Sequence, residues 1–297
     1  MKMKKLVLLL AAAMMLSVLS ACGEKNRESD SKQGAAPSAA ATVAATATVA
    51  PSASPEAAKG KVAEIKKAGV VVMGTSADYA PYEFHKNIEG KDTIVGFDVE
   101  IAKMIAADLG VKLEIKDMGF DGLLAALNSD KVDFVISGMT PNEERLKSVD
   151  FSQIYYNAEQ VILIRTGDKD KFKSMDDLKK VNIGVQTASI QEDLAKEQLA
   201  GAKIKPIGKI TDLVLELKTK KIDAIVMESP VANGYVKKNP DLAISSVKPE
   251  AEEAGSAIAV KKGNDALTAE INKTLDRLIK DKTIDKLVDE AFLLQEQ

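Results

Sequence analysis

The stretch FDGLLAALNSDKVDFVISG at residues 120–138 aligns without a gap with ITDLVLELKTKKIDAIVME at residues 210–228. The paired leucines of each copy lie four residues apart, a spacing that places them on one face of a helix. An apolar run follows the shared aspartate of each copy, Asp133 and Asp223, and is typical of a buried strand. Each copy therefore predicts a helix, a tight turn and a strand, so we expect two α/β lobes of the same construction. The alternative is a chance likeness of two such units.

The chain on either side of this repeat has the same alternating character. From residue 69 onward, short β-branched runs alternate with amphipathic stretches, which is typical of a mostly parallel sheet covered by helices. Glycine at residue 110 and Asn-Pro at 239–240 supply helix stop signals. The predicted strands are 70–73, 112–116, 132–136, 161–165, 181–185 and 222–227. The predicted helices are 97–109, 121–128, 190–199, 211–218, 230–238, 265–280 and 283–292.

In open parallel sheets, ligands bind beyond the carboxyl ends of the strands. In the first predicted lobe these ends are the loops 137–140 and 74–84, the second of which is rich in aromatic residues. In the second lobe they are 228–230 and 184–192. Two lobes that face each other would bring the four loops together in one cleft.

The N-terminal residues predict export and a lipid anchor. Three lysines precede an apolar run at 6–19 that is too short to span a bilayer, so residues 1–21 are predicted to be a cleaved signal peptide. Residues 19–22, Leu-Ser-Ala-Cys, resemble a bacterial lipobox, which implies a diacylglyceryl thioether and acyl chains such as palmitate on Cys22. Residues 22–58, rich in Ala, Ser, Thr and Pro, are predicted to be a disordered tether. The alternative is a cysteine in an ordinary secretory signal or in the core.

Composition excludes several classes of function. No basic patch interleaved with aromatic residues is present, which argues against nucleic acid as a partner. Cys22 is the single cysteine and His85 the single histidine, so an internal disulfide, a histidine metal cluster and a cysteine protease are excluded. We expect no cofactor and no metal.

A set of short motifs resembles one family across residues 61 to the C-terminus. The motifs occur in the order found in family 3 of the bacterial solute-binding proteins, the polar amino acid-binding proteins of ABC importers. Within that family, the second-lobe stretch and residues 251–259 look most like arginine-binding lipoproteins. The motifs are GTSADY (74–79), VGFDV (95–99), FDGL (120–123), SGMT (137–140), Arg145, VDFS (149–152) and GVQ (184–186).

The resemblance implies a two-lobed, periplasmic-binding-protein-like fold of type II, with two mostly parallel sheets joined by two crossover strands. It implies a non-enzymatic monomer that binds arginine or another basic amino acid, with glutamine next, and delivers it to a membrane permease by lobe closure. The lipid anchor would hold it at the extracytoplasmic face of the cell membrane. The implied boundaries are 59–154 with 257–297 for lobe 1, 160–251 for lobe 2, and 155–159 with 252–256 for the crossover strands.

The resemblance also implies which residues bind the α-carboxylate of the ligand. Arg145 stands where the family places an arginine for this purpose, and a guanidinium suits a carboxylate because it donates two parallel hydrogen bonds. The backbone N–H groups of Ser189 and Ile190, at a predicted helix start, bind the same group from the other lobe. The alternatives are a solvated helix charge for Arg145 and a plain N-cap for Ser189.

Other positions are implied to bind the α-ammonium and to enclose the side chain of the ligand. Glu228 stands where the family carries an acidic residue, more often aspartate, while Gly138 offers its carbonyl and Thr140 its hydroxyl. Tyr79 and Phe120 match the aromatic walls of the family's pocket, which favour a guanidinium by cation–π contact. The alternative for these two aromatic residues is ordinary burial in the core.

The residues that select the ligand side chain are less defined. Four residues match or neighbour pocket-lining positions of the family, namely Ser76, Asp78, Gln186 and Met227. Relatives that bind basic side chains often carry an acidic residue at the position of Ser76. Asp78 takes that role if its side chain faces the pocket, and otherwise it is a solvent-facing turn residue.

Two other classes of function stay open at this point. A dehydratase or lyase on the same fold would need a general acid in the cleft, and carboxylates are abundant in this chain. A sensor module of a signalling receptor is disfavoured, because no membrane-spanning or kinase-like region follows Phe292.

Overall fold

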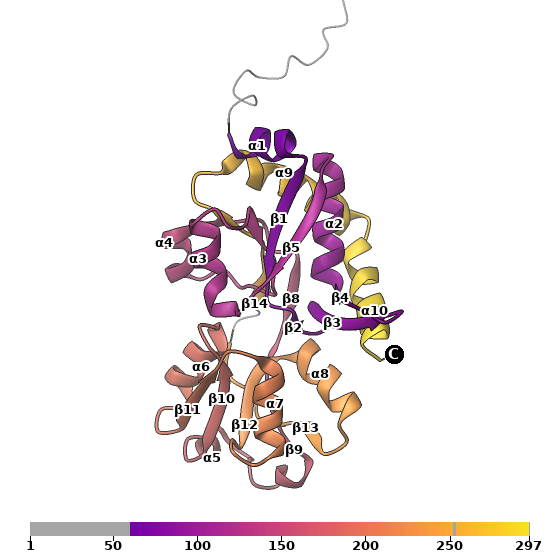
Figure 1. Ribbon diagram of the computed structural model, residues 1–297. Coiled ribbons are helices and arrows are strands. Elements are labelled where there is room, and N and C mark those ends of the chain that lie inside the picture. Colours follow the sequence, from indigo (N-terminus) through magenta and orange to yellow (C-terminus); the bar gives the residue numbers. More distant parts are fainter. Residues whose placement is uncertain (1–59, 252–253, 297) are drawn as a thin grey trace, which may run out of the picture. The chain divides into compact units, whose positions relative to one another are not determined.

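A computed structural model of the protein describes residues 60–251 and 254–296 (Figure 1). No helix within these two ranges is long and apolar enough to cross a membrane. Several predicted features lie outside the described residues, namely the signal peptide 1–21, Cys22, the tether 22–58, and Glu252 and Glu253 of the second predicted crossover strand.

Two five-stranded sheets organise the described part of the chain into two lobes. The strands of lobe 1 are β1 (Val70–Thr75), β5 (Lys112–Asp117), β6 (Phe134–Val135), β7 (Val149–Phe151) and β15 (Ala259–Lys261). The strands of lobe 2 are β9 (Gln160–Arg165), β10 (Asn182–Gln186), β11 (Lys203–Ile207), β12 (Ala224–Glu228) and β13 (Leu242–Ile244).

The two sheets have equivalent strand orders. Lobe 1 runs β5-β1-β6-β15-β7 and lobe 2 runs β11-β10-β12-β9-β13. In each sheet the first three strands are parallel and the fourth is antiparallel to both of its neighbours. The predicted fold class, α/β with two mostly parallel sheets, is confirmed.

Helices cover these sheets (Figure 1). The C-terminal helix α10 packs against α2 and α9 of its own lobe and against α8 of the other, so it contacts both lobes. Lobe 1 contains α1 (Lys61–Ala68), α2 (Phe97–Leu109), the 3-10 turn η2 (Phe120–Gly122), α3 (Leu123–Asn128), α4 (Glu143–Ser148), α9 (Asp265–Lys280) and α10 (Thr283–Glu296). Lobe 2 contains the 3-10 turn η3 (Thr166–Asp168), α5 (Met175–Leu178), α6 (Ile190–Gln198), α7 (Ile210–Lys218) and α8 (Ser229–Lys238).

The repeated sequence forms the same structure twice. A carboxylate oxygen of Asp133 accepts the backbone N–H of Val72 at 2.8 Å, and the matching Asp223 accepts that of Asn182 at 3.0 Å. Both N–H groups belong to the neighbouring parallel strand, β1 or β10. The turn before each strand holds a residue at positive φ at the same repeat position, one of 58° and one of 62°. The likeness of the two segments is therefore structural and not a chance match.

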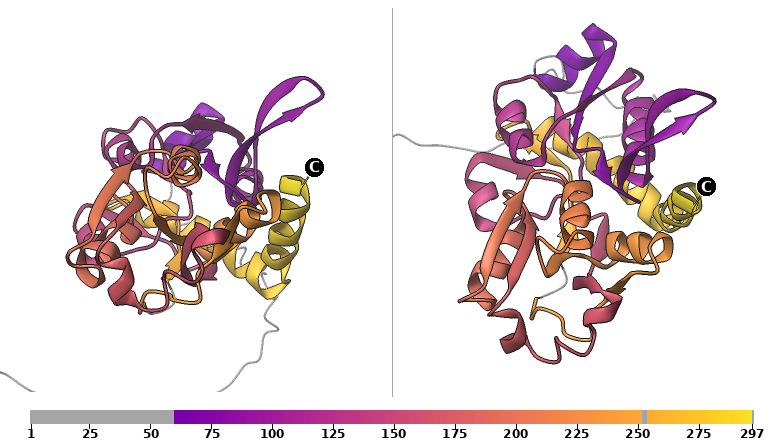
Figure 2. Two further views of the ribbon diagram at one scale, coloured as in Figure 1. Left: turned by 90° about the horizontal axis from the view of Figure 1, so that it is seen from below. Right: turned by 60° about the horizontal axis from the view of Figure 1, so that its bottom comes forward.

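Two smaller sheets lie between and beside the lobes. Strand β8 (Tyr156–Ala158) pairs with β14 (Ala254–Ser256) in an antiparallel ribbon, within the two predicted crossover segments 155–159 and 252–256. A second small sheet holds β2 (Asp78–Tyr79), β3 (Glu83–Ile88) and β4 (Lys91–Val95). The hairpin of β3 and β4 projects from its lobe in both views of Figure 2.

A close approach of backbone to backbone orients the start of α2. Gly96 adopts a φ of 128°, and a Cβ there would come within 2.0 Å of the carbonyl oxygen of Tyr82. The backbone N–H groups of Phe97 and Asp98 donate to the carbonyls of Pro81 and Tyr82 at 3.2 and 3.0 Å. Glycine is required here because it tolerates both the dihedral angle and the contact. The carboxylate of Asp98 is thereby placed in the first turn of α2.

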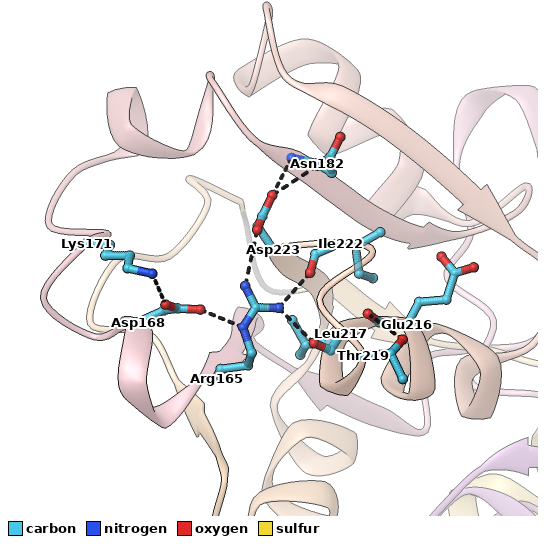
Figure 3. Close-up of polar contacts among 9 residues, drawn as sticks. All are labelled: Arg165, Asp168, Lys171, Asn182, Glu216, Leu217, Thr219, Ile222 and Asp223. Atoms are coloured by element: carbon cyan, nitrogen blue, oxygen red, sulfur yellow. Dashed lines mark hydrogen bonds and ion pairs between the residues drawn. The ribbon is translucent and has the colours of Figure 1, made fainter.

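Arg165 joins β9 to the repeated unit of lobe 2 (Figure 3). Its side chain, 15% exposed, donates to Asp168 at 2.6 Å and to Asp223 at 3.1 Å. It also donates to the carbonyls of Leu217 and Ile222, each at 2.7 Å. The guanidinium therefore closes the turn between α7 and β12 while it balances the charge of Asp223.

We expect Arg165→Ala to destabilise lobe 2 markedly. The change leaves the carbonyls of Leu217 and Ile222 without this donor and leaves Asp168 with Lys171 as its remaining cation, and breaking a buried ion pair costs about 3 to 5 kcal/mol. The readout is the free energy of unfolding in urea. Arg277→Ala is the matched control, because its side chain is 49% exposed and bonds Asp108 at the surface, where a pair contributes about 0 to 1 kcal/mol. Equal losses in the two variants would contradict the structural role given to Arg165.

Candidate functional site

Residues that follow or end β1, β6 and β10 line one cavity between the lobes, where the sequence predicts a cleft. The turn after β6 holds Gly138 at a φ of 54°. A Cβ at this glycine would lie 3.2 Å from the ring of Tyr79. Because glycine has no Cβ, the backbone of the turn can lie directly against the ring of Tyr79, which forms an aromatic wall of the cleft.

Most of the predicted ligand-binding residues line one small cavity. Lobe 1 contributes the larger share of its walls and lobe 2 contributes three residues. The cavity measures about 10 Å³, which is close to the space that one water molecule needs. An amino acid therefore enters only when the lobes separate. The predicted residues that line it are Tyr79, Phe120, Gly138, Thr140, Arg145, Gln186 and Ile190, and Ser137 and Gln191 complete it.

Arg145 is a buried cation at the lobe interface. It is 8% exposed, and its Nη1 and Nη2 atoms donate to the carbonyls of Thr140 at 2.6 Å and Ala188 at 2.9 Å. Its guanidinium lies 5.4 Å from the centroid of the Phe120 ring. Burial lowers the pKa of Arg145 to about 10. Within the described ranges no carboxylate lies within 4.0 Å of it. Because Arg145 is buried, the alternative of a solvated helix charge does not apply.

The start of α6 faces Arg145 from lobe 2. Ser189 is the N-cap: its Oγ accepts the backbone N–H of Glu192 at 3.2 Å and donates to the carbonyl of Gln186 at 2.7 Å. The backbone N–H of Ser189 donates to the same carbonyl at 3.3 Å. Ile190 occupies the first helical position, where an N–H has no acceptor inside the helix. Ser189 therefore caps the helix, and Ile190 keeps a donor at the cavity.

Glu228 is a buried anion at the end of β12. It is 1% exposed, and its Oε2 atom makes no hydrogen bond. Burial raises the pKa of Glu228 to about 7, although the nearby hydroxyl of Tyr82 opposes the rise without reaching hydrogen-bond geometry. Within the described part of the chain no lysine, arginine or histidine nitrogen lies within 4.0 Å of its carboxylate. Glu228 does not line the small cavity. It lies near the ring of Tyr79, because the charge of Glu228 is, next to burial, the largest cause of the raised pKa of that tyrosine.

Further polar atoms at the site are buried without a partner. They include the hydroxyl of Thr140 and the amide nitrogen of Gln160, whose oxygen accepts from Gln191 at 2.9 Å. A buried polar atom without a partner costs about 1 to 3 kcal/mol, so such atoms call for an explanation. A polar ligand would provide one here.

The remaining predicted positions lie elsewhere. Ser76 and Asp78 line a separate cavity of about 770 Å³. Asp78 accepts the backbone N–H of Ile210 at 2.7 Å across the lobe interface and the hydroxyl of Ser76 at 3.2 Å. Asp78 is therefore not a solvent-facing turn residue, and its acceptors are already engaged. Met227, 1% exposed, is part of the core. The larger cavity is lined neither by Arg145 nor by Thr140, whose hydroxyl has no partner. We therefore place the candidate site at the smaller cavity.

Sequence reasoning missed two carboxyl groups of the cleft. Glu83 and Asp98 are both 0% exposed, and both bond the turn at Ser137 and Gly138. A signal was present, because an aspartate between Phe97 and an apolar helix face is an unusual place for a charge.

His85 lies away from the cleft chemistry. It is in β3 of the projecting hairpin, where its two ring nitrogens contact Asp92 at 2.9 Å and Asp117 at 3.2 Å. Its side chain is 44% exposed. Among the described residues, no group of histidine, cysteine and acidic side chains is arranged to hold a metal ion.

Comparison with known proteins identifies the family of this chain. The sequence profile of the bacterial extracellular solute-binding proteins, family 3, matches residues 71–293. The arginine-binding extracellular protein ArtP of Bacillus subtilis is 41% identical over 98% of both chains. The L-cystine-binding protein TcyJ of Escherichia coli is 31% identical over 79% of this chain and 86% of its own.

A solved structure has the same arrangement of lobes. The amino acid ABC transporter substrate-binding protein AbpA of Streptococcus pneumoniae, bound to L-arginine, superposes with a TM-score of 0.77. It is 38% identical, and the match covers 79% of this chain and 99% of that protein.

Burial of Glu228 predicts a pH dependence of stability. Its pKa is raised from 4.5 to about 7, so the stability that it contributes is complete below pH 4.5 and is lost as pH rises through about 7. In the absence of ligand, the melting temperature should fall between pH 5 and 9 more steeply for the wild type than for Glu228→Gln, which cannot ionise. Glu114→Gln, with a side chain 51% exposed, should follow the wild type. Parallel profiles for all three proteins would show that Glu228 does not titrate in this way.

Proposed function

Because the chain belongs to family 3 of the bacterial extracellular solute-binding proteins, we propose that it is the exported substrate-binding component of an ABC importer for a polar amino acid. The relatives in the comparison are described as binding proteins, and the chain is a binding protein and not an enzyme. These matches span nearly the whole of the described chain and favour transport over a dehydratase on the same fold.

One observation carries the proposal. Arg145 of lobe 1 and Glu228 of lobe 2 are a buried cation and a buried anion, and neither has an ion-pair partner within the described ranges. A buried charge without a counter-ion is costly. A zwitterionic amino acid supplies both missing counter-charges at once, its carboxylate to Arg145 and its ammonium to Glu228.

At the carboxylate, Arg145 acts with the start of α6. The guanidinium exchanges its carbonyl acceptors for two parallel bonds to the carboxylate, which are stronger because both partners are charged. The N–H of Ile190, at the N-terminal end of α6, adds a donor from the other lobe, whereas the N–H and the hydroxyl of Ser189 already donate to Gln186.

At the ammonium, Glu228 acts with two groups of lobe 1. The hydroxyl of Thr140 is unpartnered, and the carbonyl of Gly138 lies in the turn beside Tyr79. An ammonium beside Glu228 favours the ionised carboxylate and so lowers the raised pKa of that group. Ligand binding is therefore coupled to release of a proton near neutral pH.

Tyr79 and Phe120 enclose the side chain of the ligand, with Gln186 as a polar neighbour; Ser76, which lines the separate larger cavity, has no part in this enclosure. We favour arginine or another basic amino acid, with glutamine next. ArtP is an arginine-binding protein and AbpA is bound to L-arginine. The guanidinium of Arg145 lies 5.4 Å from the centroid of the Phe120 ring, and this contact supports a cation–π role for the ring.

Transport follows from ligand-dependent closure of the lobes. The bond from Asp78 to Ile210 spans the interface in the closed arrangement, and the bond from Arg145 to Ala188 spans it until the ligand carboxylate takes its place. A ligand that contacts both lobes binds the closed form more tightly and shifts the population toward it. The closed monomer then docks on the permease, while the lipid on Cys22 and the tether 22–58 keep it at the membrane.

A thermal-shift screen tests the function. The domain from residue 60 is mixed with each of the twenty amino acids, and a ligand at 100 times its dissociation constant stabilises it by about 2.7 kcal/mol. We expect the largest shift with arginine. Absence of a shift with every amino acid would contradict the proposal, and recovery of a chemically altered ligand by mass analysis would contradict a purely binding role.

The two charged residues of the cleft should each be essential for affinity. Arg145→Ala and Glu228→Ala each remove one partner of a buried charge pair, at a cost of about 2 to 5 kcal/mol. That cost corresponds to a loss of about 30-fold to several thousand-fold in affinity by calorimetric titration. Both variants should keep the circular dichroism of the wild type, and Arg277→Ala serves as the control for loss of an exposed arginine. Affinities within about threefold of wild type in both folded variants would place the site elsewhere.

The anchor has a separate test. Cys22→Ser removes the sulfur on which the thioether forms, so the protein should appear in the medium or remain unprocessed. Membrane fractionation and mass analysis of the mature N-terminus are the measurements. An unmodified cysteine in the wild type, together with unchanged membrane association of the serine variant, would contradict lipidation.

A further inference from the structure

Two fully buried carboxyl groups flank the turn that follows β6. Glu83, in β3, accepts the hydroxyl of Ser137 at 2.6 Å, and that hydroxyl in turn accepts the backbone N–H of Ser76 at 3.1 Å. Asp98, in the first turn of α2, accepts the backbone N–H of Gly138 at 2.9 Å and the hydroxyl of Tyr155 at 2.9 Å. Neighbouring residues of one turn are therefore held by two different acids.

Each acid has one buried oxygen atom without a partner, Oε2 of Glu83 and Oδ1 of Asp98. Within the described ranges no cationic nitrogen lies within 4.0 Å of either carboxyl group. The two carboxyl groups are close enough for a side-chain hydrogen bond between them to shift the pKa of each. Two ionised carboxylates buried in this arrangement without a cation would be strongly destabilising. A single proton between the two unpartnered oxygens removes one charge and satisfies both atoms.

The surroundings of each acid indicate which one keeps the proton. Burial, followed by the charge of Asp98, raises the pKa of Glu83 well above its ordinary value. Burial raises the pKa of Asp98 to about 6, and the Gly138 N–H and the Tyr155 hydroxyl oppose the rise. Asp98 also stands at the start of α2, where the helix dipole stabilises an anion. Glu83 is therefore the protonated member and Asp98 the ionised one.

The groups that face the pair are acidic or neutral. Asp78 approaches from β2 and Glu228 from β12, and the hydroxyl groups of Tyr79 and Tyr155 complete the surroundings. None of these groups can replace the proton with a positive charge. Loss of the proton would leave two adjacent anions next to the Ser137–Gly138 turn.

We propose that Glu83 and Asp98 share one proton, donated by Oε2 of Glu83 to Oδ1 of Asp98, and that the pair positions the Ser137–Gly138 turn for binding of the ligand ammonium. The positioning part rests on the proposed function, since it assigns the Gly138 carbonyl to the ammonium. Neither acid needs to touch the ligand. Both act through the backbone and hydroxyl groups of the turn.

The first test measures melting temperature against pH from 6 to 10 without ligand. Glu83 has a raised pKa, so its contribution to stability is present at low pH and is lost as pH rises through its folded-state pKa. Glu83→Gln imitates the protonated acid, since its amide donates to Asp98 and its oxygen accepts from Ser137. Its melting temperature should fall less with pH than that of the wild type. Glu114→Gln, an exposed change of the same kind, should follow the wild type. Equal profiles of wild type and Glu83→Gln would overturn the shared proton.

The second test measures the affinity for L-arginine by calorimetry at pH 7. Glu83→Ala leaves the Ser137 hydroxyl and Asp98 without their partner, and the affinity should fall by about 5- to 100-fold. Glu83→Gln should recover most of that loss. Equal losses in the two variants, or none in the folded alanine variant, would overturn the positioning role. If the wild type binds no amino acid, the proposed function fails while the melting profiles still decide the shared proton.

Discussion

Burial of charge without a counter-ion is the constraint on which the cleft of this protein depends. Arg145 and Glu228 lie on opposite lobes with no ionic partner in the described chain, and burial moves both of their pKa values toward neutrality. Such groups oppose closure by themselves and favour it when a zwitterion lies between them. Glu83 and Asp98 face the same constraint, and a shared proton satisfies it without a ligand. The same low-dielectric interior thus accounts for both the proposed binding site and the proposed frame around it.

The internal repeat forms the same helix–turn–strand unit in both lobes, and the two units end in different residues. Asp133 and Asp223 each tie their strand to the next parallel strand through a backbone N–H, and each has a cation beside it, Lys61 at 2.7 Å or Arg165 at 3.1 Å. The last positions of the two copies are Gly138 and Glu228. One copy therefore ends in a carbonyl exposed by glycine and the other in a carboxylate, which are the two kinds of acceptor proposed for one ammonium.

Strongly periodic segments were predicted well, and short or polar ones were not. The helices α2 and α9 begin and end at the predicted residues, because their apolar positions repeat over three turns or more. The predicted strand 132–136 is shortened to β6, Phe134–Val135. It starts after Asp133 because the carboxylate of that residue takes a backbone N–H that a longer strand would use, and β12 starts after Asp223 for the same reason. Strand β11, sequence KIKPI, was missed because lysine and proline are poor strand signals, and both are tolerated there because β11 is an edge strand.

The sequence by itself determined the α/β class, the two-copy construction and most of the loops that form the cleft, because helix and strand periodicity and motif order are local properties of the chain. Only the tertiary structure decided which charged groups meet. Asp78 bonds Ile210, 132 positions further along the chain, and Glu83 and Asp98 converge on one turn from a strand and a helix. These contacts depend on how whole elements pack and on which buried groups lack a partner. Local sequence patterns predict neither the packing of whole elements nor the buried groups that lack a partner. The reason is that the cost of a buried charge depends on neighbours that are distant in sequence.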